Sequence, residues 1–203
     1  MTTYEKILKK FELPDDVKSP YKLKHFKRYD MAGMFKELGY KVGAEIGVYK
    51  GEYSEILCVQ NPNLKLYCID PWTVYETKEN EFYSQNQEAL DSFYEETKQR
   101  LAPYNCEIIK KTSMEAVKDF APNSLDFVYI DANHDFDHVT EDLREWAKIV
   151  RTDGIVSGHD YGHYKHKDRS LGAKKAIDNY VGEHGVKLFL VNRNFQTSWF
   201  FVK

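Results

Sequence analysis

The feature that most constrains this chain is the regular exchange of strand-like and helix-like segments after residue 40. Strands are predicted over residues 41–48, 64–70, 106–111, 124–131, 154–160, 186–191 and 197–203. Helices are predicted between them, over residues 54–60, 87–101, 113–120, 137–150 and 172–184. This spacing is typical of a parallel sheet with helices on both faces. Right-handed crossovers then make the sheet doubly wound.

The last two predicted strands break this alternation. Only the five residues "NRNFQ" separate them, which is too short for a crossover helix, so the last strand must run antiparallel to its neighbour. The predicted fold class is therefore α/β, a Rossmann-like doubly wound sheet of seven strands with the last strand antiparallel and helices on both faces.

The first 40 residues are predicted to form an N-terminal helical extension, with one domain over residues 41–203. Two helices are expected, over residues 2–13 and 22–39, the second ending at Gly39 as a C-terminal glycine would. A basic cluster in the second helix favours a solvated face over a binding patch; it consists of Lys22, Lys24, Lys27 and Arg28. The helices could instead form a dimer interface, so a homo-oligomer stays open.

Composition narrows the class of protein. Charged residues make up 30% of the 203 residues and the net charge is −3, which suits a soluble globular chain and makes a nucleic-acid partner unlikely. No secretory signal or membrane-spanning stretch is expected, so no membrane partner is predicted. Three cysteines without metal-ligand spacing, Cys58, Cys68 and Cys106, indicate free thiols and a cytoplasmic location.

Polar groups follow each predicted parallel strand at its carboxyl end, where open α/β sheets bind ligands. In chain order these groups are Glu45 and Gly47, Asp70, Thr112 to Met114, Asp131 to Asp135, and His159 to Tyr161. Because these strand ends meet at one edge of the sheet, a small-molecule site is predicted there.

The first of these ends is the loop "VGAEIGVYKGEYS". Gly47 and Gly51 allow a tight turn and a close backbone approach, but the loop lacks the three-glycine pattern of a pyrophosphate cradle. Asp70, at the tip of the next strand, suits two ribose hydroxyls. A cofactor with a ribose and no phosphate fits best, and S-adenosylmethionine is one. Glu45 would accept near its positive charge, and Ser54 is expected to cap the following helix.

Three segments together resemble class I S-adenosylmethionine-dependent methyltransferases: "GAEIGVYKGEYSEIL", "LYCIDPW" and "LDFVYIDANHDFDHVTEDLREWAKIVRTDGIVSGHDY". The nearest subgroup is the small bacterial and phage enzymes related to sugar, macrolide and catechol-type O-methyltransferases, and the resemblance spans residues 35–203. It implies O-methylation of a small hydroxylated, sugar- or catechol-like substrate with S-adenosylmethionine as cofactor.

The resemblance also implies roles for single residues. The cofactor residues it implies are Glu45, Gly47, Val48, Tyr49 and Gly51 in the loop, Asp70 at the ribose, Pro71 and Trp72 along the adenosine, Ser113 and Met114 beside the adenine, and Asp131 facing the methyl group. In metal-dependent relatives Asp131 and Asp160 would bind a divalent cation, here Mg²⁺, which would lower the pKa of the acceptor hydroxyl. His134 is the candidate general base, so Asp131 and His134 are the catalytic candidates.

Two departures from the family pattern leave alternatives open. Tyr161 stands where catechol-type enzymes have an asparagine metal ligand, which weakens the expectation of a cation. His159, His163 and His166 indicate either a different metal or a polar lid, and the lid is favoured. Two other functions compete with O-methylation. One is an N- or nucleic-acid methyltransferase on the same fold, but such enzymes often carry an Asn/Asp-Pro-Pro-Tyr/Phe motif after the fourth strand, where this chain has "DANH". The other is a non-catalytic S-adenosylmethionine-binding module.

Overall fold

A computed structural model of the chain describes residues 1–74, 86–162, 170–191 and 197–203. The strands are β1 (Tyr21–Leu23), β2 (Val42–Ile46), β3 (Lys65–Ile69), β4 (Cys106–Ile109), β5 (Leu125–Ile130), β6 (Val150–Gly158), β7 (Phe189–Val191) and β8 (Ser198–Val202). The helices are α1 (Thr3–Lys10), α2 (Arg28–Leu38), α3 (Glu52–Gln60), α4 (Gln87–Leu101), α5 (Ser113–Ala116), the short 3₁₀ helix η1 (Val117–Asp119), α6 (Phe136–Ile149) and α7 (Ser170–His184).

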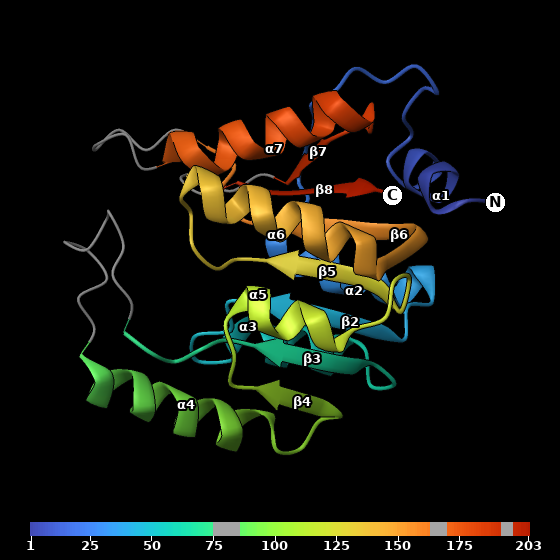
Figure 1. The fold of residues 1–203 in the computed structure, drawn as a ribbon. Coiled ribbons are helices and arrows are strands. Elements are labelled where there is room, and N and C mark those ends of the chain that lie inside the picture. Colours follow the sequence, from blue (N-terminus) through green and yellow to red (C-terminus); the bar gives the residue numbers. More distant parts are fainter. Residues whose placement is uncertain (75–85, 163–169, 192–196) are drawn as a thin grey trace.

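All described strands form one sheet in the order β1-β7-β8-β6-β5-β2-β3-β4. The central strands β2, β3, β4, β5 and β6 pair in parallel, and β8 lies between β6 and β7, antiparallel to both (Figure 1). The α/β class, the doubly wound order and the antiparallel last strand are thus confirmed.

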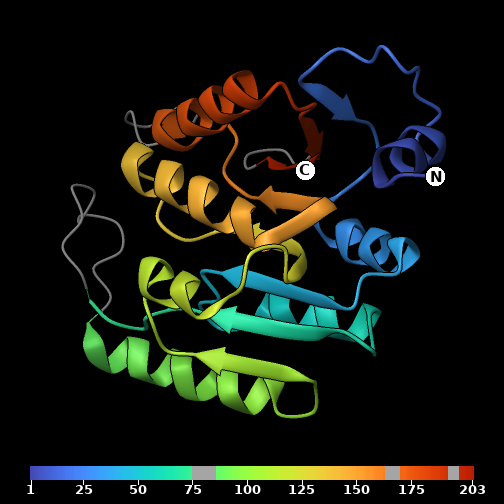
Figure 2. The same cartoon turned by 45° about the vertical axis from the view of Figure 1, so that its right-hand side comes forward.

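The predicted count of seven strands is wrong, because the described residues contain eight. β1 pairs in parallel with β7, with Tyr21 opposite Phe189, and Figure 2 shows it beside β7 at one edge of the sheet. The second predicted helix accordingly begins at Arg28, not at Lys22, and ends with Gly39 in the left-handed conformation as expected. Residues 1–40 therefore contribute a strand to the sheet, while the domain boundary after residue 40 stays a prediction.

Apolar side chains pack against both faces of the sheet. One core joins the sheet to α1, α2, α3 and α4 and includes Phe35 and Phe127, whose rings stack at 4.2 Å. A second core joins the opposite face to α5, α6 and α7 and is centred on Trp146. Because β2 and β5 are covered on both sides, their residues are almost continuously buried, as expected for parallel strands.

The three cysteines, distant in the sequence, gather in the first core. Cys58 on α3 and Cys106 on β4 have sulfur atoms 3.3 Å apart, and Cys68 on β3 contacts the hydroxyl of Ser54 at 3.5 Å. All three are free thiols, as predicted. In the described part of the chain, no helix is long and apolar enough to cross a membrane.

Candidate active site

The carboxyl ends of β2, β3, β5 and β6 meet at one edge of the sheet. Backbone hydrogen bonds continue the ladder past the strands: the N–H of Gly47 donates to Ile69, that of Asp131 to Ile46, and that of His159 to Ile130, at 2.9, 2.8 and 3.0 Å. The polar residues that follow these strands therefore come together as the sequence predicted.

The loop after β2 crosses very close to the loop after β5. Gly47 has φ +88°, and a Cβ atom placed on it would lie 2.2 Å from the carbonyl oxygen of Asp131. Tyr49 and Gly51 also have positive φ, 55° and 75°, and Gly51 is the N-cap of α3. Glycine at position 47 is required both for its conformation and for this backbone contact.

Asp70 holds that loop in place. Its Oδ2 accepts hydrogen bonds from the N–H groups of Val48 and Tyr49 at 3.0 and 2.9 Å, and its Oδ1 accepts one from Trp72 at 2.8 Å. Burial raises the pKa of Asp70, while these three N–H donors oppose the rise. The N–H groups of Val48 and Tyr49, which could otherwise bind a phosphate, thus donate to the Asp70 carboxylate. Each carboxylate oxygen accepts about two hydrogen bonds, so Oδ1 keeps capacity for a ribose hydroxyl.

Trp72 also stabilises the loop after β2. Its side chain is 1% exposed, its indole N–H donates to the carbonyl of Tyr49 at 2.7 Å, and its ring lies 4.9 Å from that of Tyr94. Pro71 beside it is half-buried. Contact of Pro71 and Trp72 with an adenosine stays a prediction. Through its hydrogen bond to Tyr49, Trp72 stabilises the conformation of the loop.

Glu45 lies beneath the loop and is 1% exposed. The hydroxyl of Ser54 donates to its Oε2. Burial raises the pKa of Glu45 to about 8, although Ser54 and Arg28 oppose the rise. The prediction that Ser54 caps the helix is wrong, because α3 begins at Glu52 with Gly51 as its cap, and the hydroxyl serves Glu45 instead.

Ser113 begins α5, where Thr112 caps the helix by accepting from the N–H of Glu115. The Ser113 hydroxyl donates to Asp142 on α6 and accepts from the indole N–H of Trp146 at 2.8 Å. Its side chain therefore joins α5 to α6. Met114 is half-buried against the second core. The placement of both beside an adenine stays a prediction.

Two carboxylates and two imidazoles gather where β5 and β6 end. The Nδ1 atom of His159 lies 3.3 Å from Asp160 Oδ2 and 3.8 Å from Asp131 Oδ1. The Nδ1 atom of His134 lies 3.3 Å from the same oxygen of Asp160. Asp160 is 5% exposed at its side chain and has φ 62°. Asp131, His159 and Asp160 each offer one ligand atom, all within 4.8 Å of one another.

His159 thus belongs to the acidic cluster, and the prediction that groups it with a polar lid is wrong. Its position directly before Asp160 at the end of a strand was the signal for this. His163 and His166 lie outside the described residues. The hydroxyl of Tyr161 donates to Asp178 on α7 at 2.8 Å, so this side chain is committed to the helix layer.

Arg28 enters the site from the N-terminal segment, which sequence reasoning missed. Its Nη2 lies 2.8 Å from Asp131 Oδ2, and its side chain is 22% exposed. The three lysines of the predicted basic cluster, Lys22, Lys24 and Lys27, are exposed as expected. The solvated face predicted for Arg28 is wrong, because its side chain pairs with Asp131. The two residues are 103 positions apart, so local sequence does not indicate that they are partners.

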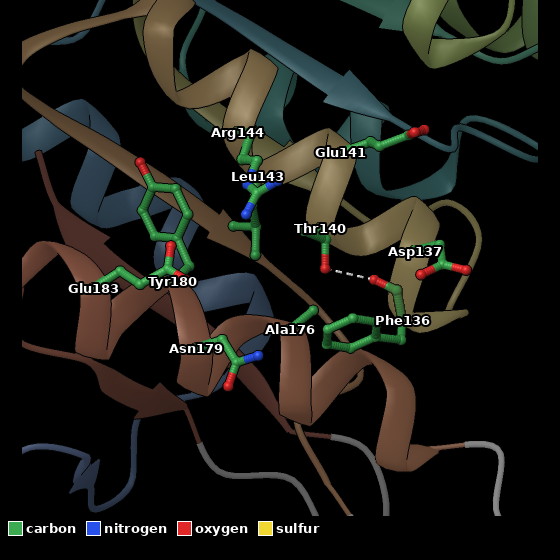
Figure 3. A pocket seen from close by; sticks show the side chains of 10 residues that line it. All are labelled: Phe136, Asp137, Thr140, Glu141, Leu143, Arg144, Ala176, Asn179, Tyr180 and Glu183. Atoms are coloured by element: carbon green, nitrogen blue, oxygen red, sulfur yellow. Dashed lines mark hydrogen bonds between the residues drawn. The ribbon is translucent and has the colours of Figure 1, made fainter.

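A hollow of about 330 Å³ lies elsewhere, between α6 and α7 (Figure 3). It contains none of the predicted site residues, and its lining includes the charged side chains Asp137, Glu141, Arg144 and Glu183 and the ring of Tyr180. It is a groove between two packed helices, so the active site is assigned to the sheet edge, where the convergent polar groups lie.

Solved structures similar to this chain share its fold. An O-methyltransferase from Bacillus cereus in complex with SAH is 15% identical with a TM-score of 0.64, over 99% of this chain and 90% of that one. The O-methyltransferase TomG from Streptomyces achromogenes, involved in tomaymycin synthesis and in complex with SAM, is 18% identical with a TM-score of 0.64, over 97% and 86%. Spermidine synthase from Thermotoga maritima is 16% identical with a TM-score of 0.59, over 88% and 60%. At these identities the likeness establishes the fold and not the acceptor.

The sheet order and the polar edge are those of the class I methyltransferase fold, and the family model below assigns the chain to the S-adenosylmethionine-dependent methyltransferases. Within that class the chain belongs to the Methyltransferase domain family, whose sequence model matches residues 44–161. The comparison with curated proteins found no match.

Proposed function

We propose that this methyltransferase transfers a methyl group to a hydroxyl oxygen of a small sugar- or catechol-like substrate, with help from a divalent cation. The observation that carries this proposal is the cluster of Asp131, His134, His159 and Asp160 beside the glycine loop. A cofactor-binding module has no need for two carboxylates and two imidazoles at this place.

S-adenosylmethionine supplies an electrophilic methyl group on a sulfonium, and its transfer is an in-line displacement that leaves a neutral thioether. The buried side-chain oxygens of Glu45 can accept a hydrogen bond from an amino group of the ligand, and the spare capacity of Asp70 Oδ1 fits a ribose hydroxyl. The residues proposed to hold it are Glu45, Gly47, Val48, Tyr49, Gly51, Asp70, Pro71, Trp72, Ser113, Met114 and Asp131.

The donor set also fits a divalent cation. Two carboxylates suit Mg²⁺, and an imidazole as third ligand adds Mn²⁺ to the candidates. We assign Asp131, His159 and Asp160 as the ligands. The ion would lower the pKa of a coordinated acceptor hydroxyl.

His134 is the proposed general base. Asp160 Oδ2, 3.3 Å from His134 Nδ1, orients the ring when Nδ1 carries its proton. In that tautomer Nε2 takes the proton of the acceptor hydroxyl as the oxygen–carbon bond forms. Asp160 therefore serves two groups, as a ligand and as the residue that fixes the base.

The experiment that tests the function begins with calorimetry of the purified chain against S-adenosylmethionine and against NAD. Binding of the first and not of the second is expected. Formation of S-adenosylhomocysteine is then measured with panels of catechols, hydroxylated sugars, amines and nucleic acids. Transfer confined to amines or nucleic acid would refute O-methylation, and binding without transfer to any acceptor would favour the binding module.

The roles of single residues are tested on the best acceptor. His134→Gln should lower kcat by about 10²-fold or more, as expected for loss of a positioned base. The matched control is His138→Gln, because His138 lies on the same segment with a side chain 54% exposed. Asp160→Ala should remove the effect of added Mg²⁺ or Mn²⁺. Full activity of the Asp160 variant in the presence of a chelator would contradict the cation.

A further inference from the structure

The guanidinium of Arg28 occupies an unusual position for a residue in a basic stretch. It lies in the first turn of α2, yet its Nη2 reaches Asp131, a proposed cation ligand, at 2.8 Å. The other oxygen of Asp131 faces His159 at 3.8 Å. Arg28 and the proposed ion site therefore share one carboxylate.

The position of Arg28 is well defined by its surroundings. Its Cζ lies 4.3 Å from the ring centre of Tyr53 and 5.0 Å from that of Tyr129, two rings that are 4% and 0% exposed. The hydroxyl of Tyr53 donates to the backbone carbonyl of Arg28 at 3.2 Å. The rings of Tyr53 and Tyr129 and the carboxylate of Asp131 thus all stabilise the guanidinium at this position.

The guanidinium of Arg28 nevertheless does not use all of its hydrogen-bond donors. The Nε atom of Arg28 is buried and makes no hydrogen bond within the described residues. An arginine paired with a carboxylate can donate through two nitrogens, and a single Nη2 contact uses only part of that capacity. The pair is therefore one that another cation can compete with.

The charge of Arg28 is permanent under all conditions of interest. Burial lowers the pKa of its guanidinium, but Tyr129, Asp131 and Glu45 outweigh that effect and the pKa is raised overall. A divalent ion bound by Asp131, His159 and Asp160 would therefore always lie near the positive charge of Arg28, which is paired with its ligand Asp131.

We propose that Arg28 is a positioning residue that acts through Asp131, and that it sets the affinity of the proposed site for a divalent cation by competing with the ion for this carboxylate. This inference depends on the cation site proposed above and adds the element that regulates it. The N-terminal segment, through one side chain, would decide how strongly the catalytic edge binds its ion.

The test is Mn²⁺ binding measured by calorimetry on the whole chain, without S-adenosylmethionine or acceptor. Arg28→Met removes the charge and keeps an apolar stem against the tyrosine rings. It should bind Mn²⁺ at least about tenfold more tightly than the unmodified chain, a change of about 1.4 kcal/mol. Arg28→Lys keeps a positive charge but loses the planar group that stacks on the rings, so its gain in Mn²⁺ affinity should be smaller than that of Arg28→Met. A merely structural role would weaken Mn²⁺ binding in Arg28→Met, not strengthen it.

The double variant Arg28→Met with Asp131→Asn should lose the gain. The inference is overturned if Arg28→Met binds Mn²⁺ no more tightly than the unmodified chain, or if the gain survives in the double variant. Arg28→Gln, which keeps a polar head group, replaces the methionine variant if thermal melting shows that the latter does not fold.

Titration of the same samples with S-adenosylmethionine separates this inference from the proposed function. If the cofactor does not bind but the Mn²⁺ affinities follow the predicted order, the methyl-transfer proposal fails and the inference about Arg28 stands. If the cofactor binds and Mn²⁺ affinity is unaffected by Arg28→Met, only the inference about Arg28 fails.

Discussion

Replacing Glu45 by glutamine should change how the stability of this protein depends on pH. Glu45 is 1% exposed, and burial raises its pKa from 4.5 to about 8 in the folded chain. The unfolded chain loses this proton near pH 4.5, whereas the folded chain keeps it until about pH 8. Between these values the folded state binds more protons, so the contribution of Glu45 to stability falls as pH rises.

The size of the effect follows from the two pKa values. A difference of about 3.5, at 1.36 kcal/mol for each pKa unit, corresponds to about 5 kcal/mol at pH 8 and above. At pH 4.5 and below this destabilisation is absent. The glutamine variant carries no proton to lose, and its side-chain oxygen can still accept from Ser54, so at pH 5 it should unfold within about 1 kcal/mol of the unmodified chain.

The assay is urea unfolding of both proteins at pH 5, 6, 7, 8 and 8.5. Taking the difference in unfolding free energy between them cancels other titrating groups, such as Asp142, whose pKa burial raises to about 6. Glu45→Gln should become the more stable protein as pH rises, by up to about 5 kcal/mol. Glu52→Gln, at an exposed site on the neighbouring helix, is the control and should track the unmodified chain. A difference that stays constant from pH 5 to 8.5 would refute the reasoning.

Other predictions concern the backbone and the thiols. Gly47→Ala should cost about 2 kcal/mol or more, because the residue has positive φ and its Cβ would meet Asp131; equal thermal stability would contradict this. Gly182→Ala, in α7 with open space around it, is the control and should stabilise the protein by about 0.5–1 kcal/mol. Hydrogen peroxide should convert the two thiols of Cys58 and Cys106 into a disulfide with release of two waters, seen as a 2 Da loss by mass spectrometry that Cys106→Ser abolishes. Peptide mapping that finds no cross-link at partial oxidation would contradict the sulfur geometry.

The order of elements was predictable because buried parallel strands and amphipathic helices leave different patterns. α4 has the bounds that its sequence predicts, and the antiparallel β8 follows from a connection too short to cross over. β1 was not predictable from local sequence. It has only three residues, its middle residue Lys22 and the following Lys24 are lysines, and the strand that stabilises it is formed near the other end of the chain.

The site was predictable to the extent that it follows strand ends. Asp70 and Asp131 each directly follow a strand whose neighbours are parallel, and the sheet brings them to one edge. Arg28 and Ser54 could not be assigned in this way, because their partners are chosen by packing. A serine at the predicted start of a helix, eight residues after β2 ends, resembles a helix cap until the buried acid beside it is known.

The position of β8 in the sheet has a consequence for the synthesis of this protein. β8 separates β6 from β7, and β1 in turn lies outside β7, with Leu188 donating from its backbone to Ser19 across 169 residues of sequence. During translation β1 is therefore among the first segments to leave the ribosome and among the last to find a partner. The apolar side chains of β1 stay unpaired until β7 and β8 have been made, and a chain that ends before them would leave β6 as an open sheet edge and β1 without a partner strand.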